Sequence, residues 1–528
     1  MVIATSGSDF DIIIVSGEPY ADHPLSPVGM IARVLDAEGF KVGVIECPDW
    51  KGKADFLKLG RPRLFFGITS GSIDSMLVNY TPLKRERAVD PNAPFASRMP
   101  DRAVIVYANR IRELFKGVPI VLGGIEASLR RFAHYDYWGD DVRRSILLDT
   151  RADILVYGPG ELQVVEIARR LDRGEGLDAI RGTSIVRAEA PDGALVIPSF
   201  EEVQADKDKF CEAQKRLTNR KTIAQKHANR YVVQYPAPDY TPADLDRAFS
   251  LPFTRRIPEG FPELGMARFS VQTHRGCRGR CSFCALSLHQ GDRIISRSEA
   301  SIIAEIRRMT THPEWRGLVD DLGGPTANMY GLDTGGIKEA HLRLIGLMRA
   351  ARKVPGVKKV FVRSGIRYDL AVESPEYVRE LARFHVSGLL KIAPEHVSEK
   401  VLRLMNKSGG RLRLEEFRKM FAEVTAERGG RRNGERDRPQ HLKYYFMVAH
   451  PGTTDTESRE LADFLRELER SGEKPVEGVQ IFTPTPMTRS TCMYYTGQDP
   501  MTGEAVYVPR PYAEKKAQKR MLVSQDEE

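Results

Sequence analysis

The chain has 528 residues, of which 41% are hydrophobic and 29% are charged. These proportions are ordinary for a folded globular protein, and the length allows roughly two to four domains. Lysine and arginine outnumber aspartate and glutamate by 80 to 71, a net charge of +9 that is small for this length. Nucleic acid is therefore only weakly supported as a partner.

The first residues do not read as a targeting signal. Asp9 and Asp11 stand where a secretory signal would carry basic residues, and the apolar run after them is short. No stretch reaches the ~18 apolar residues that a spanning helix needs. We therefore expect a cytoplasmic protein without a membrane partner.

The first part of the chain alternates short apolar strands with amphipathic helices. A strand is predicted at 10–17, and a helix from Pro27 to Glu38 that ends at Gly39. Further β-branched runs that end near Gly or Ser predict strands in the segments KVGVIE, LFFGITS, VPIVLGG and DILVYG. This alternation predicts an α/β fold, with a doubly wound, flavodoxin-like parallel sheet over residues 1–185.

Residues 186–265 differ in composition and are predicted to be a helical and proline-rich connector. The segment 207–230 is polar and basic, and 236–253 is rich in proline. The basic segment is predicted to be a helix. It is interpreted as a solvated connector, and a phosphate-binding face is the alternative.

A second β/α alternation begins near Ala267. A strand at 267–273 is followed by a helix from Ser298 to Met309, and further strands are predicted in the segments GLVDDLGG, KKVFVRSG, GLLKIAPE, YYFMVAHPG and GVQIFTPTP. Six repeated units predict a partial β/α barrel over residues 266–490, with its chemistry at the carboxyl ends of the strands. The Gly/Arg-rich stretch 427–440 is predicted to be a mobile loop, and 491–528 a tail packed on the barrel with a disordered end.

Three of the six cysteines, Cys277, Cys281 and Cys284, lie within eight positions directly after the first barrel strand. In a reducing compartment such a cluster points to a metal site rather than to disulfides. A [4Fe–4S] cluster normally takes four cysteines, so three would leave one iron open, as catalytic metal sites require. A zinc site completed by His274 or His289 is the alternative, although no second ligand pair is present.

The remaining cysteines, Cys47, Cys211 and Cys492, are most simply buried structural thiols. Cys492 follows the last predicted strand, so its approach to the active site is the alternative.

The motif Cys-x3-Cys-x2-Cys, with Phe283 before its last cysteine, resembles the signature of the radical S-adenosylmethionine (SAM) superfamily. Longer strings resemble the YgiQ-type radical SAM family from about residue 10 to 515, among them GGPTANMYG, VRSGIRYDLA, HVSGLLKIAPEH and GGIEASLRRFAHYDYW. The resemblance implies that the three cysteines hold a [4Fe–4S] cluster and that SAM binds its open iron. Reductive cleavage of SAM would give a 5′-deoxyadenosyl radical that abstracts hydrogen from an unknown substrate. A flavodoxin- or ferredoxin-like electron donor is also implied.

The resemblance further implies a set of SAM contacts, each with a plain strand-end turn as its alternative. Phe283 would lie against the adenine, and Glu395, at the end of the fourth barrel strand, would contact the ribose. The other implied cofactor-binding residues are Gly323, Gly324 and Thr326 in the glycine-rich motif, and Arg363 and Ser364 at the end of the third strand. Pro325 stands where that motif usually has an acidic residue. The cysteine-free stretch 331–344 gives no support for a second cluster.

A flavodoxin-like domain before such a barrel also resembles cobalamin-dependent enzymes. Asp22 and His23 are adjacent and far from Gly29, unlike a cobalamin loop, so no cobalamin is expected. The aromatic and ionic stretch 123–145 is predicted to form a domain interface, with substrate contact as the alternative. Two other functions stay open, a zinc- or cluster-containing nucleic-acid-binding protein and a SAM-sensing protein without turnover.

Overall fold

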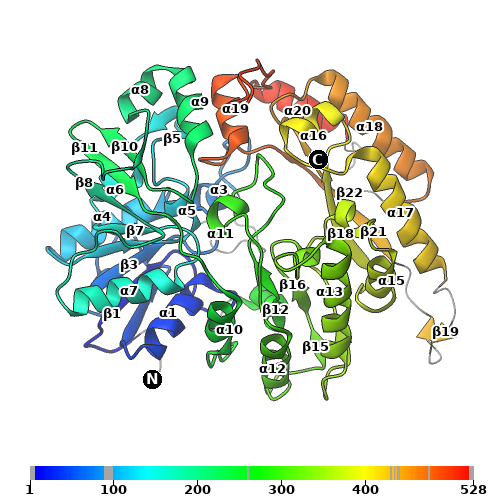
Figure 1. Ribbon diagram of the computed structural model, residues 1–528, viewed down its shortest axis with the longest axis horizontal. Helices are drawn as coiled ribbons and strands as arrows, with labels where there is room; N and C mark the ends of the chain where they lie inside the picture. The colour runs from blue at the N-terminus through cyan, green and yellow to red at the C-terminus, as the bar shows by residue number, and fades with distance from the viewer. Residues whose placement is uncertain are drawn as a thin grey trace.

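The computed structural model describes residues 6–87, 99–258, 261–427, 431–432, 435–436, 440–473 and 476–522. Two β/α units lie side by side, and the last helices of the chain lie near the junction between them (Figure 1). Within the described ranges no helix is both long and apolar enough to cross a bilayer.

The first unit is built on a nine-stranded sheet with the order β2-β1-β3-β4-β7-β8-β11-β10-β9. Its strands are Ile12–Ser16 (β1), Val42–Glu46 (β2), Phe65–Thr69 (β3), Ile120–Leu122 (β4), Ile154–Val156 (β7), Thr183–Arg187 (β8), Leu195–Ile197 (β9), Ile223–His227 (β10) and Arg230–Gln234 (β11). The strands from β2 to β7 in this order pair in parallel. The order reverses at β1, as in flavodoxin-like sheets, which confirms the predicted doubly wound fold.

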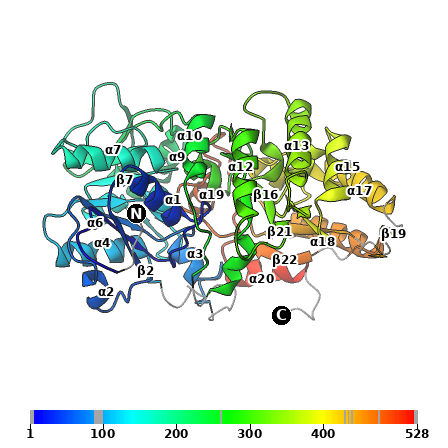
Figure 2. The same cartoon turned by 90° about the horizontal axis from the view of Figure 1, so that it is seen from below.

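Helices cover both faces of this sheet because its strands alternate their side chains between two apolar cores. Ile12 and Ile14 pack with helices α1 and α7, while Ile13 and Val15 pack with α4 on the opposite face. Figure 2 shows these layers from below. The helices of the first unit are Pro27–Ala37 (α1), Ala54–Leu57 (α2), Ser75–Asn79 (α3), Ala103–Leu114 (α4), Gly124–Ser128 (α5), Ile146–Thr150 (α6), Glu161–Asp172 (α7), Phe200–Ala205 (α8), Lys207–Arg216 (α9) and Pro242–Ser250 (α10).

The structure corrects the predicted connector. The strands β9, β10 and β11 lie within 186–265 and extend the first sheet. The basic segment 207–230 is helical only in α9 and then forms the β10–β11 hairpin, whose strands pair antiparallel. The sequence of these strands is polar because they lie at a partly exposed edge of the sheet, so no apolar strand pattern marks them. The strands with which they pair also come from other parts of the chain.

The second unit is a partial barrel whose main strands pair in parallel, while the short strands His274–Arg275 (β13) and Ile295–Ser296 (β14) pair antiparallel. Its strands are Ser270–Gln272 (β12), Leu318–Val319 (β15), Asp321–Gly323 (β16), Lys359–Val360 (β17), Leu389–Glu395 (β18), His441–Val448 (β21) and Val476–Ile481 (β22). Its helices are Leu286–Gln290 (α11), Glu299–Met309 (α12), Ile337–Arg352 (α13), Tyr368–Ala371 (α14), Pro375–Phe384 (α15), Glu399–Leu404 (α16), Gly410–Ala426 (α17) and Asp455–Arg470 (α18). This alternation agrees with the predicted barrel.

The C-terminal helices Arg489–Thr496 (α19) and Tyr512–Arg520 (α20) contact different units. Helix α20 packs on β21 and β22, as predicted for the tail, whereas α19 packs against α9 and His134–Asp136 (β5) of the first unit. Cys492 is buried there, with its Sγ 3.7 Å from that of Cys211, so the predicted structural role of both thiols agrees with their burial. Most of the loop predicted at 427–440, and the last six residues, lie outside the described ranges.

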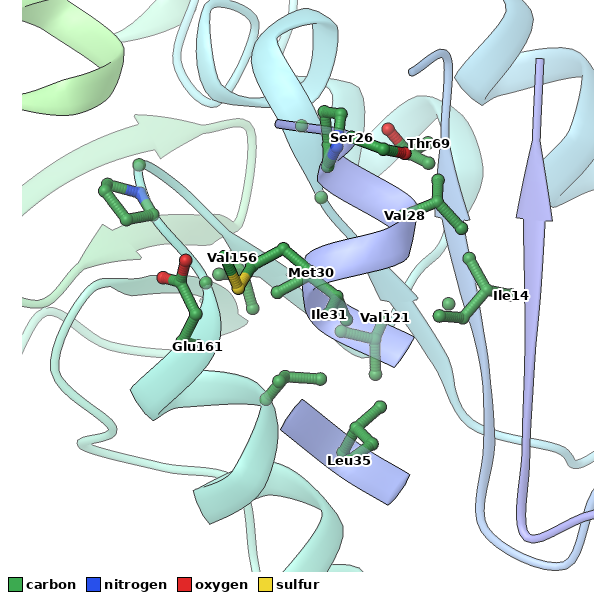
Figure 3. Close-up of a pocket in the computed structure, with 18 of the residues that line it drawn as sticks. Ile14, Ser26, Val28, Met30, Ile31, Leu35, Thr69, Val121, Val156 and Glu161 are labelled. Atoms are coloured by element: carbon green, nitrogen blue, oxygen red, sulfur yellow. The ribbon is translucent and has the colours of Figure 1, made fainter. Parts of the chain in front are cut away.

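A cavity of about 240 Å³ lies between the first sheet and helices α1 and α7, and Gln272, Arg275, His289 and Gln290 of the second unit also line it. Its lining is mainly apolar and includes Ile14 and Val121 from the sheet and Val28 from α1 (Figure 3). Gly123 also lines it, and a Cβ added there would meet no atom within 4 Å.

Candidate functional site

The three clustered cysteines lie in a tight loop between β12 and α11. Gly276 opens the loop with φ +81°, and a Cβ there would lie 1.8 Å from the Arg293 carbonyl oxygen, so only glycine fits. The Cys277 N–H donates to the Gly291 carbonyl at 3.1 Å, and the Cys284 N–H donates to the Cys281 carbonyl at 3.0 Å. The backbone therefore holds the thiols at the carboxyl end of the first barrel strand, as predicted.

Two of the three thiols, those of Cys277 and Cys281, lie beside Gly279. A Cβ at Gly279 would lie 3.4 Å from the Cys277 Sγ and 3.7 Å from the Cys281 Sγ. The Thr326 hydroxyl is 3.7 Å from the Cys277 Sγ, which brings this predicted residue to the cysteine loop. Burial raises the pKa of Cys281, and it raises that of Cys284 to about 12. A ligand that favours thiolates, such as iron, would relieve this cost.

These residues fit an iron–sulfur cluster better than a single metal ion. Among the described residues, no three His, Cys, Asp or Glu side chains converge on one ion position. The three thiols are nevertheless near enough for their charges to interact. Arg367 and Lys407 bring positive charge to Cys281, which suits an anionic cluster.

Glu395 ends β18 beside the cysteines. The Glu395 backbone has φ +68°, and the pairing of β18 with β21 shifts its register between Ile392 and Glu395. This bulge bends the end of the strand. The carboxyl group is buried, and its Oε2 has no hydrogen-bond partner in the described structure. Burial raises the pKa of Glu395 to about 7, with Lys407 acting in the opposite direction. A buried acceptor without a partner is the expected mark of a position that a ligand completes.

The glycine-rich stretch and the end of the third strand meet at Asp321. Asp321 accepts hydrogen bonds from the Arg363 N–H at 2.8 Å, from the Ser364 N–H at 3.1 Å and from the Ser364 hydroxyl. A Cβ at Gly323 would lie 2.7 Å from the Ser364 Oγ, so these two predicted residues are neighbours. The Arg363 side chain is instead exposed, with its Nη1 3.9 Å from Asp320.

Two further predicted residues flank the loop. A Cβ at Gly324 would lie 2.6 Å from the His274 ring, so glycine lets this histidine approach the backbone. The Phe283 ring lies edge-on to the His450 ring, with 6.3 Å between centroids. The roles of all these residues toward SAM remain predictions.

Sequence reasoning assigned no role to Arg367. Its Nη1 would lie 2.9 Å from a Cβ at Gly279, and its guanidinium is held by Asp369 and Ser408. Arg367 and Asp369 lie in the string VRSGIRYDLA, which carried the family resemblance, so the sequence could have pointed to them. The contacts of Arg367 with Gly279 and Ser408 form only when the barrel folds.

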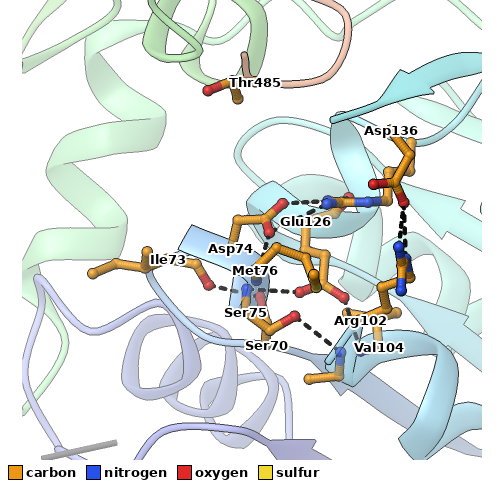
Figure 4. Close-up of polar contacts among 12 residues, drawn as sticks. Ser70, Ile73, Asp74, Ser75, Met76, Arg102, Val104, Glu126, Asp136 and Thr485 are labelled. Carbon is orange, nitrogen blue, oxygen red and sulfur yellow. Dashed lines mark hydrogen bonds and ion pairs between the residues drawn. The ribbon is translucent and has the colours of Figure 1, made fainter. Parts of the chain in front are cut away.

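The ionic stretch 123–145 forms an internal network (Figure 4). Glu126 accepts hydrogen bonds from the Ser75 and Val104 N–H groups at 2.9 and 3.0 Å. Arg130 forms a buried ion pair with Asp74, and Asp136 pairs with Arg102. These partners all lie within the first unit, so the network is engaged inside that unit, and the predicted domain interface is not what these contacts form.

The Asp22–His23 pair is likewise engaged within the protein. Asp22 pairs with Arg33, and the His23 Nδ1 accepts a hydrogen bond from the Leu25 N–H at 3.1 Å. The His23 Nε2 lies 2.9 Å from the Arg268 carbonyl oxygen, and burial lowers the pKa of His23 to about 3.

Comparison with known proteins decides the family. Residues 3–269 match the family model "Radical SAM N-terminal", residues 271–465 match "Radical SAM superfamily", and 477–528 match a domain of unknown function, DUF3362. The chain belongs to the radical SAM superfamily. It is therefore an enzyme that works with SAM and a [4Fe–4S] cluster, and its substrate is unknown.

Relatives similar over nearly the whole chain carry the name UPF0313 protein. The one from Methanocella arvoryzae is 44% identical and covers 97% of this chain and 90% of its own length. The one from Geobacter sulfurreducens is 45% identical, over 98% and 89%. This similarity agrees with the YgiQ-type resemblance of the sequence, and nothing in the comparisons supports a zinc-dependent nucleic-acid-binding protein.

Solved structures confirm the fold. The radical SAM methyltransferase TsrM from Kitasatospora setae, with cobalamin and a [4Fe–4S] cluster bound, matches with a TM-score of 0.53 at 17% identity. The match covers 99% of this chain and 86% of TsrM. At this identity the match establishes the fold, not the ligands or the reaction.

Proposed function

We propose that Cys277, Cys281 and Cys284 bind three irons of one [4Fe–4S] cluster and that SAM occupies the fourth. When bound and reduced, the cluster supplies the electron that cleaves SAM to methionine and a 5′-deoxyadenosyl radical, which abstracts hydrogen from a substrate. The observation that carries this proposal is that Cys277 and Cys281 lie beside Gly279, with Cys284 near enough for its charge to interact with both, next to the unpartnered carboxyl oxygen of Glu395.

The residues around the loop bind and orient SAM in this proposal. The Glu395 carboxylate accepts a hydrogen bond from a ribose hydroxyl, and Phe283 lies against the adenine. The backbone at Gly323 and Gly324 meets the SAM amino group. Thr326, Arg363 and Ser364 complete the set, Ser364 with its hydroxyl already oriented by Asp321.

Two cations offset the negative charge of the thiolates. Arg367 is fixed by Asp369, and Lys407 acts on both Cys281 and Glu395. The three cysteines are only partly exposed in the described structure, and bound SAM would cover them further. Exclusion of water protects a reactive intermediate from side reactions.

The test is anaerobic reconstitution followed by reduction with dithionite, with methionine and 5′-deoxyadenosine measured by chromatography. The wild-type protein should form both products slowly without substrate. Alanine at Cys277, Cys281 or Cys284 should abolish product formation and iron binding together. Alanine at Cys47 or Cys211 is the control and should leave both unchanged.

The same experiment separates an enzyme from a SAM sensor. If wild-type protein with a verified reduced cluster binds SAM but forms no deoxyadenosine with any candidate substrate, the turnover proposal is wrong. A physiological electron donor of the flavodoxin or ferredoxin type should replace dithionite in this assay.

A further inference from the structure

A second, larger cavity of about 950 Å³ separates the first unit from the cysteine loop. Cys281 and Cys284 lie on its wall, together with α11 and the loop that follows β7. Residues 217–220, 236–240 and 487–489 close the remaining sides. Its volume lies within the range of pockets that hold small molecules in other proteins.

Arg131 lies on the wall of this cavity and is only 1% exposed. Its guanidinium donates to the Gln234 Oε1 at 2.7 Å, the Asn219 Oδ1 at 2.8 Å and the Ser128 carbonyl at 2.6 Å. These three acceptors are neutral, as is the Met487 Sδ at 3.6 Å, and the guanidinium also lies over the Tyr157 ring. Among the described residues Arg131 makes no ion pair, although a buried cation without a counter-charge is costly. Burial accordingly lowers the pKa of Arg131 to about 10.

The other six arginines on the cavity wall are all ion-paired, so Arg131 is the one arginine of the described wall without a counter-charge. Arg275 pairs with Glu161 and Arg489 with Asp499. Asp292 is shared by Arg220 and Arg280, and Asp239 by Arg181 and Arg293.

Two buried donors on the same wall lack an acceptor in the described structure. They are the Gln163 Nε2 and the Arg275 Nη1. Unsatisfied donors and an unbalanced buried cation both call for an acceptor with negative charge.

We propose that this cavity is the substrate site and that it takes a small molecule with a carboxylate or phosphate group, which Arg131 binds. This inference rests on the proposed function and adds the chemical class of its substrate. The anionic group pairs with Arg131, and the remainder of the substrate extends toward the wall that carries Cys281 and Cys284.

The test titrates inorganic phosphate and, separately, succinate into the reconstituted full-length protein, with heat of binding as the measurement. Wild-type protein should bind at least one of them saturably, and the stronger of the two identifies the anionic group. Arg131→Gln should weaken that binding at least tenfold, whereas Arg173→Gln, on the exposed surface, should not change it.

A second variant tests the charge without removing the arginine. Asn219→Asp places a carboxylate next to the Arg131 guanidinium and supplies the missing counter-charge. It should abolish anion binding, and the new ion pair should offset the hydrogen bond that the Asn219 Nδ2 donates to the Leu288 carbonyl oxygen, so the melting temperature should not fall. Loss of binding with an unchanged iron content and a melting temperature at or above that of the wild type cannot be ascribed to misfolding.

The outcomes separate this inference from the proposed function. Substrate-independent deoxyadenosine formation should be unchanged in the control Arg173→Gln, and it is measured in every variant beside anion binding. If neither anion binds, or if Arg131→Gln and wild-type protein bind equally, the inference is wrong even where SAM is cleaved. If binding depends on Arg131 but no SAM is cleaved, the proposed function fails and the anion site stands.

Discussion

Glu395 joins a left-handed backbone conformation to a buried carboxyl group without a partner. Each feature is unfavourable for a glutamate, since non-glycine residues avoid positive φ and buried acceptors are normally paired. Such strain persists where the surrounding structure enforces it, and it gathers at binding sites. A bound ligand that donates a hydrogen bond to the Glu395 carboxyl group would account for both features, and the predicted contact to SAM is of this kind.

The corresponding prediction is that Glu395→Ala weakens SAM binding while iron content stays intact. A hydrogen bond to a charged acceptor is worth roughly 1.5–3 kcal/mol. The dissociation constant should therefore rise roughly tenfold to hundredfold. Equilibrium dialysis with labelled SAM measures it, and the exposed Glu376→Ala serves as the control. Unchanged affinity would remove Glu395 from the site.

At the scale of the element, helix α20 is anchored through a buried lysine. The Lys515 Nζ donates to the Tyr137 and Tyr494 hydroxyl oxygens at 3.2 and 3.0 Å, and it lies over both rings. One side chain thus ties the C-terminal helix to the first unit and to α19. Burial lowers the pKa of Lys515 to about 8.

This lowered pKa predicts a pH dependence of stability. Between pH 8 and 10.5 the folded state binds fewer protons at Lys515 than the unfolded state, so its contribution to stability rises with pH. Below pH 8 keeping the buried amine charged costs on the order of 3 kcal/mol, and Lys515→Met has no such pH-dependent cost. Urea unfolding should therefore show the free energy of unfolding of the wild type rising relative to that of the variant between pH 7 and pH 10. The exposed Lys519→Met is the control, and its difference from the wild type in free energy of unfolding should not change with pH. The same constant difference for Lys515→Met would contradict the prediction.

Two glycines at strand ends predict opposite outcomes for the same substitution. Gly123 has φ −154° and open space at its Cβ position, so Gly123→Ala should raise the free energy of unfolding by about 0.4–1 kcal/mol. Gly276→Ala should destabilise the cysteine loop and lower iron content, because its Cβ would collide with Arg293. Urea unfolding measures the stability of both variants, and iron analysis measures the cluster content of Gly276→Ala. A lower free energy of unfolding for Gly123→Ala than for the wild type would contradict the first prediction.

Across the whole molecule, the cysteines outside the loop cannot serve the same cluster. Cys211 and Cys492 face one another between α9 and α19, and Cys47 follows β2 in the first unit. We therefore predict one cluster, with about four irons per chain after clean reconstitution. Close to eight irons per chain by colorimetric analysis would contradict this prediction.

The first unit resembles cobalamin-binding enzymes in fold, yet no bound cobalamin is predicted. Both ring nitrogens of His23 lie within hydrogen-bond distance of backbone groups, at Leu25 and Arg268, so the ring has no nitrogen free for a metal in this conformation. Protein from cobalamin-supplied cells should lack corrinoid absorbance. A stoichiometric corrinoid spectrum would show the prediction to be wrong.

The sequence by itself determined the features that depend on neighbours along the chain. The spacing of Cys277, Cys281 and Cys284 and the alternation of strands with helices are local patterns, and each was found where it was predicted. Only the tertiary structure decided that β9 to β11 join the first sheet, because strand pairing depends on partners distant in sequence. It also decided that Glu395 lacks a partner and that Arg131 has no counter-charge. Burial and charge balance are set by segments far apart in the chain, which meet only when it folds.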